Sequence, residues 1–182
     1  MRIIAGRWRG RSLRAPRGSA TRPTSERVRE ALFAVLGDLT GARVLDLYAG
    51  SGALGLEALS RGAVHATFVE SARGARSAIL ANLEAIGATS EATVLGVPVE
   101  RVGAALAERG PFDLVLCDPP WPELDRALAA LSRLLERAPL ATGGRLVVEH
   151  PALREVSLAG LSELDRRRWG DTAVTLFRPS VG

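Results

Sequence analysis

The stretch FDLVLCDPPW, residues 112–121, decides the fold that we expect for this chain. Its first six residues are mostly apolar and precede two prolines, which indicates a short buried strand. Two consecutive prolines can neither extend a strand ladder nor begin a helix at once, so the chain must leave the sheet there. Asp118, the Pro119 carbonyl and the indole of Trp121 then lie at the carboxyl end of the strand, where open α/β sheets bind ligands.

These three groups suit a flat base that carries an exocyclic amine. Asp118 and the Pro119 carbonyl can accept the two N–H bonds of the amine, and Trp121 can cover the face of the ring. They are the candidate catalytic residues. Taken alone, the motif fits equally well a loop with a capping aspartate and a packed tryptophan.

Strand and helix patterns alternate on both sides of this strand. Such alternation with short connections predicts an α/β fold with a mostly parallel sheet and helices on both of its faces. Near the end of the chain, two further strand patterns flank Gly170-Asp171 and predict a closing antiparallel hairpin, which brings the sheet to seven strands. The expected strands are 43–48, 65–70, 92–95, 112–117, 145–149, 161–169 and 172–178, and the expected helices are 54–61, 72–86, 99–109 and 123–137.

One more helix is expected before the first strand. It should begin after Pro23, with Thr24 or Ser25 as its N-cap, and end near Gly37. Its apolar residues recur at helical spacing and predict one buried stripe, with Arg27 and Arg29 off it. The stripe consists of Val28, Ala31, Leu32, Val35 and Leu36. We therefore expect a basic N-terminal extension, residues 1–22, with a possible short hairpin, followed by one domain, residues 23–182.

Composition excludes several classes of protein. A chain of 182 residues with 47% hydrophobic residues is large and apolar enough for one globular core. Its single cysteine, Cys117, rules out an internal disulfide, and its two histidines lack ligand-spaced partners, so no metal site is expected. No apolar run reaches the roughly 20 residues needed to span a bilayer, and no signal peptide is apparent. A cytoplasmic location is the default expectation.

Positive charge is concentrated at the start of the chain. The first 30 residues hold nine arginines against only Glu26 and Glu30, and the chain contains no lysine. Guanidinium groups match phosphate oxygens in a bidentate manner, so this arm predicts binding to nucleic acid. Trp8 could stack on an unpaired base, or it could equally attach the arm to the body of the protein. The candidate RNA-binding residues are Arg7, Trp8, Arg9, Arg11 and Arg22.

A glycine-rich loop follows the first strand of the sheet. The segment LDLYAGSGALG, residues 45–55, contains the pattern G-x-G-x-x-G, and Glu70 ends the next strand, where it could accept both hydroxyls of a ribose. A nicotinamide dinucleotide is the first candidate ligand. Asp46, however, places a negative charge close to the loop, which suits a cofactor with an amine and a sulfonium better than a pyrophosphate. S-adenosylmethionine is such a cofactor.

Three segments carry a resemblance to a known family. MRIIAG (residues 1–6), RPTSERVREALF (22–33) and LDLYAGSGALGLEALSRG (45–62) closely resemble the bacterial 16S rRNA guanine-N2 methyltransferases, the RsmD family. The resemblance extends from residue 1 to the final hairpin. It implies a Rossmann-like class I methyltransferase that uses S-adenosylmethionine to methylate the exocyclic N2 amine of a guanine in small-subunit rRNA.

The resemblance also implies roles for individual residues. The segment from Asp118 to Trp121 would hold the guanine, with Trp121 in place of the Tyr or Phe that the family favours. Thr24 and its neighbours would close over the methionine end of the cofactor. After the third strand this chain reads GVPVE, residues 96–100, where related enzymes often have an aspartate for the adenine amine, so backbone groups and apolar packing would recognise adenine. The implied cofactor-binding residues are Thr24, Asp46, Tyr48, Gly50, Ser51, Gly52, Glu70 and Val97.

The expected partner is 16S rRNA in an assembling or assembled small subunit, bound by a monomer. Two other activities remain open. The Asp-Pro-Pro-aromatic motif also serves amino-methyltransferases that act on adenine N6 or cytosine N4 of DNA, and the glycine loop also serves nicotinamide-dependent oxidoreductases. A non-catalytic RNA-binding factor is disfavoured, because that role requires neither Asp46 nor Asp118.

Overall fold

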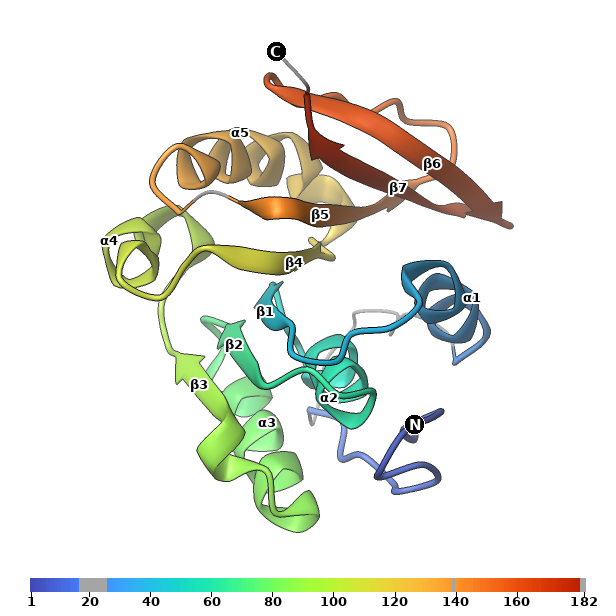
Figure 1. Cartoon of the computed structure of the whole chain (residues 1–182), viewed down its shortest axis with the longest axis vertical. Coiled ribbons are helices and arrows are strands. Elements are labelled where there is room, and N and C mark those ends of the chain that lie inside the picture. Colours follow the sequence, from blue (N-terminus) through green and yellow to red (C-terminus); the bar gives the residue numbers. More distant parts are fainter. Residues whose placement is uncertain (17–25, 139, 181–182) are drawn as a thin grey trace.

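Seven strands form one sheet in the computed structural model, which describes residues 1–16, 26–138 and 140–180 (Figure 1). The strand order is β3-β2-β1-β4-β5-β7-β6. The first five strands are parallel, and β7 is antiparallel to both β5 and β6, as the sequence predicts. The strands are β1 (Arg43–Leu47), β2 (His65–Val69), β3 (Ala92–Leu95), β4 (Phe112–Cys117), β5 (Leu140–Pro151), β6 (Leu161–Trp169) and β7 (Thr172–Pro179).

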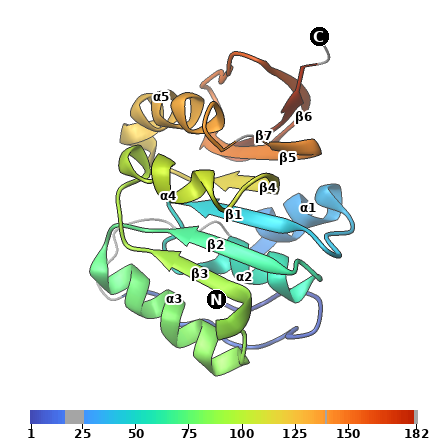
Figure 2. The same cartoon turned by 60° about the vertical axis from the view of Figure 1, so that its left-hand side comes forward.

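Helices cover both faces of this sheet. Figure 2 shows β3, β2, β1, β4 and β5 stacked one above another, each next to its hydrogen-bonded neighbours. Buried side chains of the first three helices share a core with one face of the sheet, and those of the last two share a core with the other face. The helices are α1 (Glu26–Leu36), α2 (Ala53–Ser60), α3 (Arg73–Ile86), α4 (Gly103–Ala107) and α5 (Leu124–Leu135). In the described part of the chain, no helix is long and apolar enough to cross a bilayer.

Three local expectations were wrong or incomplete. The predicted helix 99–109 is a 3₁₀ turn, Val99–Arg101, followed by the short helix α4. Gly103 lies at the break, where a glycine costs a helix about 1 kcal/mol. The predicted strand 145–149 is only the centre of the longer β5, and the predicted strand 43–48 ends before Tyr48, whose φ of 57° is left-handed.

The predicted buried face of α1 was also displaced. Arg29 is fully buried, whereas the prediction placed it off the apolar stripe, and Ala31 and Val35 are only partly buried. The buried set is Val28, Arg29, Leu32, Phe33 and Leu36. Arg29 is tolerated there because its Nε lies 3.9 Å from the buried carboxylate of Glu57 on α2, and because its guanidinium also donates to the Arg2 carbonyl.

The N-terminal arm is packed into the body of the protein. Arg2 and Ser12 form an antiparallel bridge, and Ile3 and Leu13 are 1% and 7% exposed in the core shared with α1 and α2. Glu57 accepts hydrogen bonds from the backbone N–H groups of residues 4 and 5, at 2.8 and 3.0 Å. The arm thus completes a core that the helices alone would leave open. The expected domain boundary at residue 22 and the expected N-cap, Thr24 or Ser25, lie outside the described residues.

Candidate active site

The carboxyl ends of β1 and β4 lie side by side and form the centre of the site. Leu47 is paired with Cys117, so Tyr48 and Asp118 follow at the same edge of the sheet, and the Asp118 N–H donates to the Leu47 carbonyl at 3.5 Å. A cleft of about 1320 Å³ opens at this edge, and Asp118, Pro119 and Trp121 line it. Trp121 begins a 3₁₀ turn and is 40% exposed, so its ring is available to a ligand.

The glycine turn between β1 and α2 forms the neighbouring wall. Gly50 has a φ of 56° and donates its N–H to Glu70 Oε2 at 2.8 Å. Gly52, with a φ of 79°, does not line the cleft, and a Cβ on it would lie 3.2 Å from Ile79. A Cβ on Gly55 would lie 2.3 Å from the ring of Phe68. The first glycine therefore faces the cleft, and the other two let α2 pack closely on the sheet.

Asp46 lies at the base of this turn with one oxygen unpaired. Its side chain is buried, and its Oδ2 accepts the Gly55 N–H at 2.9 Å. Its Oδ1 is buried and makes no hydrogen bond to any of the described residues. Burial, together with the nearby charges of Asp118 and Glu70, raises the pKa of Asp46 to about 7, against the opposing effect of the hydrogen bond from Gly55. A positively charged group in the cleft would offset the effects of burial and of these charges.

Glu70 is held in a fixed orientation at the end of β2. Its Oε1 accepts the Ala72 N–H at 2.7 Å, while its Oε2 accepts that of Gly50. Each carboxylate oxygen can accept more than one hydrogen bond, so Glu70 keeps capacity for hydroxyl groups of a ligand. This arrangement agrees with the predicted contact to a ribose, which itself stays a prediction.

The other expected cofactor residues differ in their surroundings. Tyr48, Ser51 and Val97 all line the cleft, and Val97 is 37% exposed. The Tyr48 hydroxyl is buried and has no hydrogen-bond partner in the described part of the chain, and burial raises the pKa of Tyr48. The Ser51 carbonyl accepts a hydrogen bond from the Asn82 amide at 3.1 Å.

Asn82 joins the glycine turn to the arm. This side chain is 1% exposed, and besides Ser51 it binds Arg14 twice, accepting the Arg14 N–H at 2.7 Å and donating to the Arg14 carbonyl at 3.1 Å. Nearby, Met1, Ala15 and Pro16 line the cleft. Both ends of the described arm therefore reach the site.

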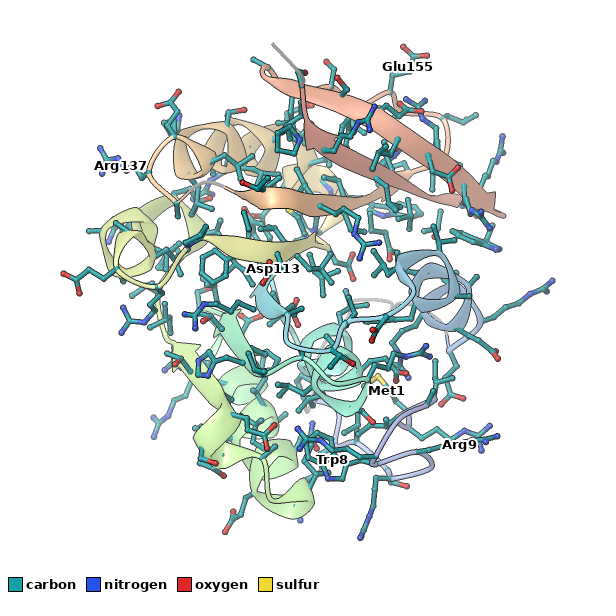
Figure 3. All side chains as sticks on the ribbon, in the orientation of Figure 1. Met1, Trp8, Arg9, Asp113, Arg137 and Glu155 are labelled. Carbon is teal, nitrogen blue, oxygen red and sulfur yellow. The ribbon has the colours of Figure 1, made fainter. Side chains whose placement is uncertain are left out.

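The predicted RNA-binding residues of the arm fall into two groups. The Arg7 guanidinium lies 3.9 Å above the Trp8 ring and forms an ion pair with Glu91, and the Trp8 N–H donates to Ser60 Oγ, so this pair attaches the arm to the body. Arg9 and Arg11 are exposed and form no ion pair with another residue that the structure describes, and Figure 3 shows Arg9 extending outward. Their contact with RNA stays a prediction. The other two expected residues, Arg22 and Thr24, lie outside the described residues.

Several cleft residues were not assigned to the site by the sequence analysis, and four of them are Arg27, Glu149, Arg168 and Trp169. Glu149 was detectable in principle, because it lies near the carboxyl end of a strand next to β4, as Asp118 does on its own strand. The other three come from α1 and from the β6–β7 turn, and no local pattern in the sequence places those elements at the cleft.

Comparison with known proteins identifies the family of this chain. The family described as "Conserved hypothetical protein 95" matches residues 1–178. The chain belongs to this family, the RsmD family. The Bacillus subtilis protein YlbH is 38% identical over 184 residues, 98% of each chain. Ribosomal RNA small subunit methyltransferase D of Escherichia coli (strain K12) is 45% identical over 123 residues, which are 66% of this chain and 60% of that protein.

A solved structure shows the same fold over the whole chain. The Escherichia coli protein yhhF superimposes with a TM-score of 0.82 at 35% identity, covering 100% of this chain and 99% of that one. The architecture of this RsmD-family chain is therefore that of the class I methyltransferases, as the sequence predicts.

S-adenosylmethionine is the cofactor expected for this family, and the residues of the cleft fit it. The unpaired Oδ1 of Asp46 offers a buried negative charge to an amine or a sulfonium. Glu70 offers acceptors to ribose hydroxyls. The open side of Gly50, where an added Cβ would meet only the Tyr48 carbonyl at 3.9 Å, lets a ligand approach the backbone closely.

Proposed function

We propose that this RsmD-family methyltransferase transfers a methyl group from S-adenosylmethionine to the exocyclic N2 amine of a guanine in 16S rRNA. One observation carries the proposal. The acceptor motif, Asp118 to Trp121, and the glycine turn line one cleft from adjacent strand ends. When bound, S-adenosylmethionine supplies a methyl group on a positively charged sulfur.

Asp118 and the Pro119 carbonyl would orient the amine for attack. The lone pair of the guanine amine is delocalised into the ring, so the amine is a weak nucleophile. Two acceptors that bind both of its N–H groups favour a pyramidal nitrogen, whose lone pair then faces the methyl group. Asp118 or water takes the proton that is released. No covalent intermediate with the protein is needed, and the thiol of Cys117 is buried with a raised pKa, which makes it a poor nucleophile.

Positioning supplies most of the rate in this proposal. Well-oriented reactants reach effective molarities of about 10⁵–10⁸ M. The exposed ring of Trp121 would stack on the guanine and replace the stacking that the base loses when it leaves the RNA helix. The target is then an unpaired or extruded nucleotide.

The substrate class comes from the relatives. Proteins named ribosomal RNA small subunit methyltransferase D in Escherichia coli and Haemophilus influenzae are 45% and 36% identical to this chain over the aligned residues. The exposed arginines of the arm, Arg9 and Arg11, would bind phosphates flanking the target. A nicotinamide cofactor is disfavoured, because Asp46 would repel its pyrophosphate.

The test is methylation of purified 16S rRNA and of small subunits, with the modified nucleoside identified by mass spectrometry. We expect N2-methylguanosine from the wild type. Asp118→Ala should lose about 10²–10⁴-fold in turnover, the range for a proton acceptor, while binding of S-adenosylhomocysteine is retained. Asp113→Asn, at the other end of β4, is the matched control and should keep full activity.

Three results would contradict the proposal. Methylation of double-stranded or single-stranded DNA in place of rRNA would favour the DNA amino-methyltransferase. A different methylated nucleoside would exclude the guanine amine as the target. Wild-type turnover by Asp118→Ala would remove Asp118 from the mechanism.

A further inference from the structure

The turn between β6 and β7 forms one side of the active-site cleft. Four residues at or near this turn, Arg168, Trp169, Gly170 and Thr172, line the same cleft as Asp118. In Figure 1 the long β6–β7 hairpin extends beyond the other strands and reaches the side of the molecule where α1 lies. The last strands of the sheet thus contribute to the site as well as closing the fold.

More acidic than basic side chains line the cleft, and two of its arginines, Arg27 and Arg168, come from α1 and β6. Its acidic lining residues are Asp46, Glu70, Glu100, Asp118, Glu123 and Glu149. Of the three arginines that line it, Arg126 is engaged by Glu100 at 2.7 Å. Arg27 and Arg168 are both exposed, and neither forms an ion pair within the described residues. These two guanidinium groups are therefore available to an anion.

Arg168 differs from its two neighbours in the sequence. Arg166 binds Glu163 at 2.7 Å and Arg167 binds Asp165 at 2.8 Å, so both are paired along the hairpin. Arg168 instead donates its Nε to the Gly170 carbonyl at 3.0 Å. That contact fixes the guanidinium at the turn and leaves its two terminal amino groups for a ligand.

Packing holds the turn in place. Trp169 is partly buried against the core that includes Val174 of β7, and Trp169 pairs with Thr172 across the hairpin. The Asp171 carbonyl accepts the Ala152 N–H at 2.8 Å, which joins the turn to the segment after β5. Arg168 therefore projects from a supported turn, and it needs little ordering when it binds.

We propose that Arg168 of the β6–β7 turn, together with Arg27 of α1, binds the RNA backbone beside the nucleotide that enters the cleft. The inference rests on the proposed RNA substrate. An uncharged nucleobase can enter an acidic cleft. The phosphates on either side of it are repelled by the carboxylates that line the cleft, so their charge must be neutralised at the rim. Guanidinium groups suit that role because their donors match phosphate oxygens in pairs.

The experiment compares Arg168→Ala with Arg178→Ala, which removes another exposed arginine, from the far end of the same hairpin and outside the cleft. Binding of the full-length proteins to small-subunit rRNA is measured across a salt series. Arg168→Ala should bind about 3–10-fold more weakly, and the slope of log K against log salt should become shallower by about 0.7–0.9, as expected for one lost phosphate contact. Arg178→Ala should match the wild type in both quantities.

Further readouts separate RNA contact from general damage. Affinity for S-adenosylhomocysteine and the melting temperature should be unchanged in Arg168→Ala, and methylation assays should show a raised KM for RNA at a similar kcat. If the wild type methylates rRNA and Arg168→Ala binds RNA with unchanged affinity and slope, the assignment of Arg168 is wrong and the proposed function stands. If the wild type neither binds nor methylates rRNA, the proposed function and this inference both fail.

Discussion

Replacing Glu57 with glutamine should destabilise the protein through the loss of one buried charge. Glu57 is fully buried on α2 and accepts four contacts. Its Oε2 accepts the Ile4 N–H at 2.8 Å and lies 3.9 Å from Arg29 Nε, and its Oε1 accepts the Ala5 N–H at 3.0 Å and Arg61 Nε at 2.7 Å. An amide keeps only one acceptor oxygen, so its NH₂ group must face donors.

The magnitude follows from the charge that remains. Arg29 is buried, and desolvation already lowers its pKa against the opposing effect of Glu57. Breaking such a pair by removing one partner costs about 3–5 kcal/mol, because the other charge stays buried. For a chain of 182 residues, each kcal/mol lowers Tm by about 2–4 °C. The expected fall is therefore about 6–20 °C.

The assay is thermal unfolding, with hydrogen exchange as a local probe. The amides of Ile4 and Ala5 should exchange faster in Glu57→Gln, since they lose their acceptor. Glu30→Gln on the exposed side of α1 is the control and should stay within about 0.5 kcal/mol of the wild type. Adding Arg29→Met to Glu57→Gln should restore part of the stability, because the unpaired charge is then gone. The reasoning would be refuted if the Tm of Glu57→Gln lay within about 2 °C of that of the wild type, which corresponds to a loss of no more than about 1 kcal/mol.

Two further predictions concern the glycine turn. The pKa of Asp46 is about 7 in the folded chain against an ordinary value of 3.8, so its contribution to stability is complete below pH 3.8 and is lost as the pH rises through 7. Without cofactor, the Tm of Asp46→Asn minus the Tm of the wild type should therefore be larger at pH 8 than at pH 5. The variant should nevertheless bind S-adenosylhomocysteine more weakly. The same Tm difference at both pH values would contradict the raised pKa. Gly55→Ala should lower the free energy of unfolding by about 1–3 kcal/mol or more through overpacking, because its Cβ would lie 2.3 Å from Phe68. Gly74→Ala on α3, with open space around it, is the control and should be neutral or stabilise by up to about 1 kcal/mol. Equal unfolding free energies for both variants would count against the close packing of α2.

Most of the residues predicted for the site line one cleft in the structure, and they could be picked out because their signals in the sequence are local. Parallel strands buried on both faces are short apolar runs, and polar residues at their ends, such as Asp118 and Glu70, stand out against them. The sheet brings those ends together whatever the details of the connections. The family resemblance agreed with the fold and the cofactor that the residues indicated, and both are supported by the comparisons.

The features that were missed depend on contacts between distant segments. Arginine is a residue type usually found at exposed positions, and the burial of Arg29 is tolerated because of partners on distant segments, the Glu57 carboxylate and the Arg2 carbonyl. Arg168 and Trp169 reach the cleft because β7 inserts between β5 and β6, an order that no local pattern specifies. The break in the predicted helix 99–109 has a local cause, the glycine at position 103, and it was missed because the spacing of the apolar residues fits a continuous helix.

The hydrogen bonds of Asn82 link the arm to the cofactor turn. One amide group supports both the backbone of Arg14, where the described arm nears its end, and the carbonyl of Ser51 in the cofactor turn. A shift of Arg14 breaks two hydrogen bonds of Asn82 and frees its side chain to rotate, so Ser51 loses a support at the same moment. If the arm binds the substrate as proposed, that binding would reach the cofactor turn through this one side chain, and the order in which the two reactants bind is then a quantity that steady-state kinetics can measure.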